Sequence, residues 1–288
     1  MPHCRYALAL ALTLSLAACG EAPSAAGALG EAAAPRAEAG IAQNDRTGAE
    51  QRAAPPAFAA QMQPDTAYAD LRGAVLETGW LPLQTPGCAA NLGGDAGACR
   101  ELPELDACSA DGACLMRFGE ASSNRVLTVR TYGDLRRWKD GGDAATLRVV
   151  ESSVALPESA PDAACPASHF DGFLRAFAAA PALRLRFTAP LVQVMQSRDV
   201  FENTEIYPSV VRAEDFRGFP VTFADGAFHH LDAEGHMDPA PLTLDVSAVA
   251  DGVQRVSWSY GMSEGNAVLF SAADGCWQLV EDPEPPMP

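Results

Sequence analysis

The first periodic stretch of the chain predicts an amphipathic helix that begins near position 65. Its apolar residues recur at the spacing of one helical face: Tyr68, Leu71, Val75 and Leu76. Asp65 or Thr66 can cap the start of this helix, and Gly79 fits its end. One face of the helix should therefore be buried against a neighbouring element.

Beyond a cysteine-rich segment the apolar residues follow a period of two, which is typical of half-buried strands. The alternating residues are Cys114, Met116 and Phe118 in a first run and Leu127 and Val129 in a second. A short polar turn at 122–124 separates the two runs, so the pattern predicts a β-hairpin. We therefore expect residues 64–150 to form a small, disulfide-rich module of one helix and a hairpin.

A second helix is predicted shortly after Cys165. Its apolar positions follow the i, i+3, i+4 and i+7 pattern: Phe170, Phe173, Leu174 and Phe177. Ser168 lies three residues before Asp171, an arrangement similar to a capping box. We interpret the aromatic stripe as part of a hydrophobic core and not as a ligand pocket.

Six short runs in the last third of the chain have the composition of strands. They are Leu191–Met195, Val221–Phe223, Leu242–Val249, Val253–Tyr260, Ala267–Ser271 and Trp277–Val280. Asp-Gly pairs at 225–226, 251–252 and 274–275 provide the tight turns that hairpins favour. Helices packed on an antiparallel meander should therefore form a second module over residues 151–288. The fold class is α+β; an open cone of this kind can enclose a cavity, as in nuclear-transport-factor-like folds, but assigns no function.

The chain opens with a short apolar run that has the features of an export signal. Arg5 precedes the run, which extends from Tyr6 to Leu16. A permanent bilayer span needs roughly 20 apolar residues, and this run is too short for one but fits a secretory signal. We therefore expect residues 1–18 to be a removed signal peptide.

The end of this segment, Leu16-Ala17-Ala18-Cys19, resembles the lipobox of bacterial lipoproteins. The resemblance implies that lipid is attached to the Cys19 thiol, that the chain is cut before it, and that the new amino terminus is acylated. Several acyl chains together hold a protein firmly, because each buried CH2 contributes about 0.8 kcal/mol. Gly20 stands where an aspartate commonly retains such proteins in the inner membrane, so we expect the outer membrane, facing the periplasm. The alternative is an ordinary cleaved signal.

Residues 19–63 are rich in Ala, Gly, Pro and Glu and poor in branched aliphatic and aromatic residues. Such a segment cannot bury enough apolar surface to offset the entropy that ordering would cost. The alternative is an alanine-rich helix, which Pro23, Pro35, Pro55 and Pro56 would interrupt. We therefore expect a lipidated, disordered tether.

The charge of the chain is strongly negative. The sequence has 37 acidic and 20 basic residues, and removal of the signal peptide takes away one base, Arg5. The mature chain would then carry 37 acids against 19 bases, a formal charge of −18. This excess disfavours nucleic acid and anionic lipid as partners. It would attract a cationic protein, although an acidic surface also serves solubility alone.

Six cysteines follow Cys19, and an even number in an exported chain indicates disulfides, because the periplasm is oxidising. Their distribution favours three pairs: Cys88 with Cys99, Cys108 with Cys114, and Cys165 with Cys276. The competing use of cysteine is zinc binding, but no C-x2-C pair with partner spacing is present. No metal or other cofactor is therefore expected from the cysteines.

The stretch "GMSEG" at 261–265 fits the G-x-S-x-G pattern that marks a nucleophilic serine in many hydrolases. A nucleophile elbow has a helix directly after the serine, and its histidine follows later in the chain. Here the next residues predict a strand, and no histidine occurs after His236. We interpret the stretch as a hairpin loop, with a Ser263-based hydrolase as the alternative.

The segment "FHHLDAEGHMD" collects side chains that can bind Zn2+ or a similar cation. The candidates are His229, His230 and His236, with Asp232, Glu234 and Asp238 nearby. His229 and His230 would point to opposite faces of a strand, so at most one of them joins His236 in a single site unless a bulge intervenes. We interpret the segment as the polar rim of a hairpin, with a metal site as the alternative.

The run "SHFDGFLRAFAAAPALRLRFTAPL" at 168–191 resembles segments of lipoproteins that act as immunity proteins of bacteria-killing secretion systems. The resemblance implies neutralisation of a cell-wall enzyme, often a cationic one, and transfers no inhibitory residue. With the anchor, the tether and the acidity, it indicates a periplasmic binding module and not an enzyme. The alternatives are an envelope hydrolase, either based on Ser263 or metal-dependent through His229 or His230 with His236, and a structural envelope lipoprotein.

Overall fold

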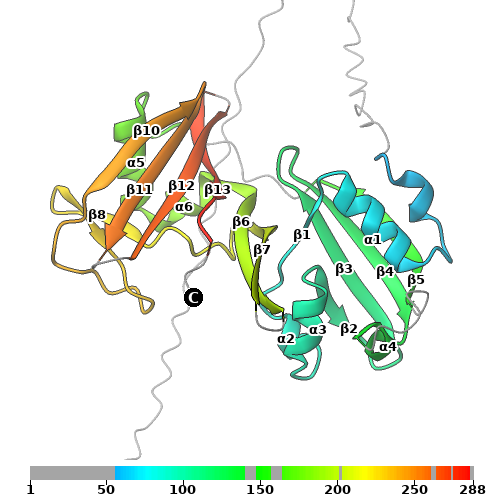
Figure 1. Cartoon of the computed structure of the whole chain (residues 1–288). Helices are drawn as coiled ribbons and strands as arrows, with labels where there is room; N and C mark the ends of the chain where they lie inside the picture. Colours follow the sequence, from blue (N-terminus) through cyan, green and yellow to red (C-terminus); the bar gives the residue numbers. More distant parts are fainter. Residues whose placement is uncertain are drawn as a thin grey trace, which may run out of the picture. The chain divides into compact units, whose positions relative to one another are not determined.

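A computed structural model describes residues 56–139, 147–156, 164–200, 203–260, 264–273 and 275–285. In these ranges the chain combines helices with two larger sheets and a separate hairpin, which confirms the α+β class (Figure 1). Ala53–Pro288 form one compact unit. No helix of the described ranges is both long and apolar enough to cross a membrane.

The first sheet has five strands in the described ranges, in the order β1-β3-β4-β5, with β2 paired to β3. They are β1 (Leu81–Pro82), β2 (Leu105–Cys108), β3 (Ala113–Glu120), β4 (Arg125–Gly133) and β5 (Leu147–Ala155). The predicted hairpin is β3 and β4, whose register places Met116 opposite Val129 and Phe118 opposite Leu127. These four side chains are buried because they share the face on which α1 packs (Figure 1).

The predicted first helix is α1 (Tyr68–Glu77), which buries Tyr68, Leu71 and Val75. Gly79, at a φ of +83°, follows it as expected. The predicted caps are not used, because Ala67 is the N-cap residue and makes no side-chain bond. The backbone at Asp65 and Thr66 instead bonds to Val149 of β5. Shorter helices complete this half of the fold: α2 (Cys88–Asn91), α3 (Ala96–Glu101) and α4 (Leu135–Lys139).

The folded chain begins earlier than the predicted end of the tether at position 63. Residues 19–55 lie outside the described residues, but Phe58 is only 1% exposed and packs edge-on against Trp80. A 3-10 helix, η1, follows at Ala59–Met62. One aromatic side chain thus anchors the last part of a segment that composition alone assigns to the tether.

The second sheet has six strands within the described ranges, in the order β10-β11-β12-β13-β6-β7. They are β6 (Thr188–Val200), β7 (Asn203–Arg212), β10 (Leu244–Ala250), β11 (Val253–Tyr260), β12 (Glu264–Ala273) and β13 (Cys276–Asp282). The expected meander is present from β10 to β13. The next pairing differs, because β13 and β6 run parallel.

The predicted strand at 221–223 belongs to a separate hairpin and not to the meander. This hairpin consists of β8 (Val221–Ala224) and β9 (Ala227–His230). Asp225 and Gly226 have φ angles of 51° and 83°, as a tight turn of the mirror-image type requires. Phe223 and Phe228 face each other across the two strands.

The helices of the second half are α5 (Phe170–Ala179) and α6 (Pro181–Arg186). Phe173 and Phe177 are fully buried, and both rings contact Phe270 of β12. The aromatic stripe is therefore core, as predicted. The similarity to a capping box is not realised, because His169 is the N-cap residue and makes no side-chain bond.

A small apolar cluster connects the two larger sheets: Leu83, Val126, Leu191 and Val210. Leu83 and Val210 form a parallel bridge, and the Gln84 N–H donates to the Val210 carbonyl at 2.9 Å. Gly119 of β3 lies against this contact. A Cβ atom there would come within 2.6 Å of Val210 Cγ2, so the close approach depends on glycine.

Candidate functional site

The predicted lipobox, Leu16 to Cys19, and Ser263 lie outside the described residues. The residues after Ser263 are described, and β12 begins at Glu264. A strand therefore stands where a nucleophile elbow has its helix.

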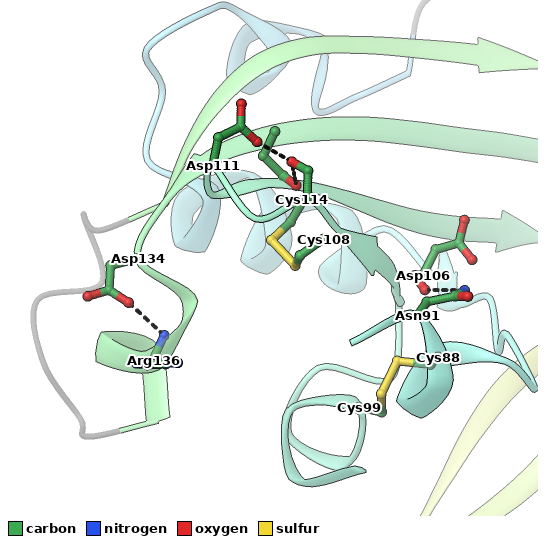
Figure 2. Close-up of a disulfide and its surroundings, with 11 residues drawn as sticks. Cys88, Asn91, Cys99, Asp106, Cys108, Asp111, Cys114, Asp134 and Arg136 are labelled. Carbon is green, nitrogen blue, oxygen red and sulfur yellow. Dashed lines mark hydrogen bonds between the residues drawn. A yellow bond between two sulfur atoms is a disulfide. The ribbon is translucent and has the colours of Figure 1, made fainter. Parts of the chain in front are cut away.

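The cysteines that follow Cys19 form disulfides in the predicted pairs. The pairs are Cys88–Cys99, Cys108–Cys114 and Cys165–Cys276. Figure 2 shows the first two, which join α2 to α3 and β2 to β3. The third joins the segment before α5 to the start of β13. Because these sulfurs are bonded to one another, they are not thiolate ligands for a metal.

The three candidate histidines do not converge on one point. His229 is only 6% exposed, and its Nδ1 lies 2.9 Å from the Asp238 carbonyl oxygen. His230 stacks on Tyr260, with the ring centres 4.0 Å apart. Neither imidazole belongs to the group of potential ligands around His236.

His236 lies with Asp232 and Glu234 in an exposed loop, where one ligand atom of each falls within 4.8 Å of the others. Asp232 accepts the backbone N–H groups of His236 and Glu234 and contacts His236 Nδ1 at 3.1 Å. The bond from the His236 N–H is the main reason why the pKa of Asp232 is lowered. These hydrogen bonds hold a tight loop together, and this explains why the three side chains lie close to one another.

A cleft of about 460 Å³ opens on the inner face of the second sheet, the face that carries its apolar core. Its wall is apolar or aromatic at Val194, Val211, Phe216, Trp258 and Tyr260. Its polar lining residues are Gln196, Asp215, Arg217, His230, Asn266, Asp282 and Glu284. The cleft therefore combines an aromatic wall with several charged groups.

The strand register explains why the inner face becomes polar here. Val256 and Val268 are paired and buried in the core, and the next inward pair along β11 and β12 is Trp258 with Asn266. Asn266 Nδ2 donates to the Gly218 carbonyl at 3.3 Å and to Asp282 Oδ2 at 3.2 Å. One amide thus holds both a loop and a carboxylate at the end of the core.

Asp282 is the central polar group of this cleft. No cationic side chain of the described residues forms an ion pair with it. A Cβ atom on Gly218 would come within 2.2 Å of Asp282 Oδ2, so the carboxylate occupies space that glycine leaves open. Burial raises the pKa of Asp282 from its ordinary value of 3.8 to about 6, and the charges of Glu284 and Glu281 add to this.

The other charged groups leave the cleft with an excess of carboxylates. Glu284 is ion-paired with Arg255, and the Arg217 guanidinium donates to nearby backbone carbonyls. Asp215 and Asp282 are the further acids of the lining. The cleft therefore disfavours an anion and favours a cation.

A wider cavity of about 1000 Å³ shares Phe216, Arg217 and His230 with the cleft. Arg184 lines it, and its guanidinium donates to the Ala178 and Phe219 carbonyls. Burial lowers the pKa of Arg184. Because these bonds hold the loop to α5, Arg184 has a structural role, and the narrower cleft is the better candidate site.

Sequence reasoning singled out neither Asn266 nor Asp282. Asn266 could have been found from the sequence, because it lies two positions before Val268 and four before Phe270, the buried apolar residues of the same strand face. Asp282 could not have been found in this way, because it is one of 37 acidic residues and no sequence spacing distinguishes it.

No protein-family model matches the chain, and no curated protein matches it significantly. Among solved structures, the chain is similar to an NTF2-like protein from Bacteroides fragilis, with 10% sequence identity and a TM-score of 0.28. The match covers 58% of this chain and 62% of that one, less than two thirds of its length. At this TM-score we draw no conclusion from the similarity.

Proposed function

We propose that this chain is a bacterial lipoprotein that is held by Cys19 at the outer membrane, faces the periplasm and binds a cationic protein. The motif Leu16-Ala17-Ala18-Cys19 supports the anchor. The three disulfides suit an oxidising compartment. A tether formed by the residues ahead of Phe58, as their composition predicts, would let the folded unit search the space near the membrane.

The observation that carries the binding role is the charge imbalance of 37 acids against 20 bases. A protein with such an excess attracts cationic partners over a distance and speeds their association. The resemblance at 168–191 supports a more specific proposal, in which the partner is a cell-wall enzyme that this chain neutralises. Phe173 and Phe177 of that run are core residues, so contact with a partner falls to other positions.

The anchor is tested by labelling cells with radioactive palmitate. Cys19→Ala should abolish labelling and release the protein from envelope fractions, because the acylated thiol is then missing. Cys4→Ala is the matched control, since Cys4 lies in the part that is removed. An unlabelled parent protein, or a Cys19→Ala variant that still sediments with envelopes, contradicts the anchor.

The partner is tested by immobilising the mature chain and passing a periplasmic extract over it at low salt. We expect a basic protein to be retained, to be eluted by high salt, and to bind again after purification. Inhibition of that protein's cell-wall hydrolysis by this chain would support the neutralising role. If nothing is retained at low salt, or the retained protein is acidic, the proposal fails.

A further inference from the structure

We infer that the cleft on the second sheet receives one arginine or lysine side chain of the partner, and that Asp282 pairs with its cationic group. The inference rests on the function proposed above and adds a place and a chemistry to it. It depends on the position of one carboxylate, the walls around it, and the charge of the whole cleft.

The bonds of Asp282 leave its carboxylate with unused acceptor capacity. Oδ2 accepts one bond from Asn266, and Oδ1 has only a long contact of 3.4 Å from the Glu284 N–H. An ionised carboxylate offers about four lone-pair sites. A guanidinium can use two oxygens at once, and an ammonium can use one.

The negative charge of Asp282 is energetically unfavourable in the protein without a ligand. Carboxylates that leave water without a cationic partner lose solvation free energy, and here no such partner is found in the described part of the chain. A ligand that brings a positive charge removes that cost on binding. An uncharged ligand of the same shape does not.

The walls of the cleft fit the rest of a long cationic side chain. Val194, Val211 and Phe216 are suited to its methylene groups. Trp258 lines the cleft, and its ring favours a nearby cation. Tyr260 also lines it, with one face of its ring stacked on His230. The volume of about 460 Å³ is within the range of small-ligand pockets and exceeds what one side chain needs.

The competing interpretation is that Asp282 is purely structural. Asn266 joins it to the Gly218 carbonyl, so the carboxylate could do no more than hold that loop against β12 and β13. In that case neutralising Asp282 changes stability but leaves the affinity for cations unchanged. Binding measurements therefore separate the two interpretations.

The test uses the mature chain with Cys19→Ser, titrated with Nα-acetylarginine amide and followed by NMR signals of the Trp258 indole and the Asn266 amide. Nα-acetylcitrulline amide has nearly the same shape without the charge. We expect the arginine probe to shift both signals and the citrulline probe to bind at least about tenfold more weakly. A lysine probe should also bind.

Asp282→Asn should weaken binding of the arginine probe by about tenfold or more. Glu281→Gln is the matched control, because it removes the same charge one residue away, where Glu281 bonds to Gln193 and does not line the cleft. It should change the affinity less than about twofold. Gly218→Ala should also weaken binding, because its methyl group would clash with both the Asp282 carboxylate and the Phe216 ring, which line the cleft.

Equal binding of the two probes, or an Asp282→Asn variant that binds like the parent, overturns the inference. Unfolding curves identify any variant that fails to fold, and the comparison of the arginine and citrulline probes on the parent protein then gives the independent result. If Asp282→Asn still captures the cationic partner from the extract, the proposed binding function is supported, and only the assignment of this cleft as the binding site is contradicted. If the probes behave as expected but no partner is captured, the cleft chemistry stands and the proposed function fails.

Discussion

Glu104 is a carboxylate without exposed surface in the first half of the fold. The Tyr68 hydroxyl donates to its Oε1 at 2.7 Å, and Arg72 Nε donates to the same atom at 2.5 Å. Burial, and then the Glu104 charge, raise the pKa of Tyr68 well above its usual value. This network joins α1 to the residues before β2, and its partners are far apart in the chain.

Glu104→Gln should lower the free energy of unfolding by about 2–4 kcal/mol, because it leaves the Arg72 charge and the Tyr68 hydroxyl poorly paired in a buried place. Denaturant unfolding measures the loss. Glu101→Gln, an exposed acid on α3, should change stability by less than about 0.5 kcal/mol. Equal effects of the two substitutions would count against the network.

Asp282 makes stability depend on pH in a defined direction. Its pKa is about 6 in the folded state and 3.8 in the unfolded state, so the folded protein binds this proton more tightly. The resulting stabilisation is fully present below pH 3.8 and is lost as the pH rises through 6. The charged groups around it are Glu281, Glu284, Asp215 and Arg217, with His230 across the cleft.

When the pH is lowered from 7 to 4, the free energy of unfolding of the parent should rise by about 1 kcal/mol relative to that of Asp282→Asn. This figure allows for solvent screening of a partly exposed group. Unfolding curves at both pH values give this difference. Because burial also raises the pKa of Glu281, Glu281→Gln has to be measured beside it. A difference that stays constant with pH would show that Asp282 does not titrate in this window.

At the scale of elements, the local pattern was sufficient for several elements that repeat one period, although β5 was missed despite its alternating first residues. The elements found in this way are the helix α1, the hairpin of β3 with β4, the helix α5 and the strands β10 to β13. β7 was missed because Pro208 interrupts it and its residues do not alternate. β1 was missed because a strand of only two residues is too short to show an alternating pattern.

The contact between the two larger sheets depends on Gly119, and this can be tested with a pair of glycines. Gly119→Ala should lower the free energy of unfolding by about 1–3 kcal/mol, because its Cβ would lie 2.6 Å from Val210 Cγ2 and 2.9 Å from Leu191 Cδ1.

Gly73→Ala is the control for the same chemical change. Gly73 lies inside α1 with nothing within 4 Å of the added atom. Alanine there should stabilise the protein by about 0.5–1 kcal/mol through helix propensity. Thermal or denaturant unfolding of both variants tests the contact, and a stabilised Gly119→Ala variant would contradict the packing.

At the scale of the whole molecule, the disulfides differ in the length of chain that they close. Cys165–Cys276 spans 111 residues and brackets nearly all of the second half, whereas Cys108–Cys114 spans 6 within a hairpin. The long bridge therefore restricts the unfolded chain far more than the short one.

Replacing both cysteines of the long bridge with serine should lower the free energy of unfolding by about 4–5 kcal/mol, and the same change in the short bridge by about 2 kcal/mol. Denaturant unfolding under oxidising conditions compares the two double variants. Mass spectrometry of a non-reduced digest confirms that the remaining bridges are unchanged. A larger loss for the short bridge would contradict the chain-entropy argument.

The sequence by itself determined the helix faces, the alternating strands and the Asp-Gly turns, because each follows from neighbours close in the chain. The distribution of the cysteines favoured the three pairs that the structure has, but the Cys165–Cys276 bridge, which spans 111 residues, depends on the tertiary fold. The tertiary structure alone decided the parallel pairing of β13 with β6, the burial of Glu104 beside Arg72, 32 residues away, and the bond from Asn266 to Gly218, 48 residues away. The same holds for the cleft, since a carboxylate such as Asp282 becomes a candidate site only when long-range packing removes water from it and brings no cation. No local period encodes that environment.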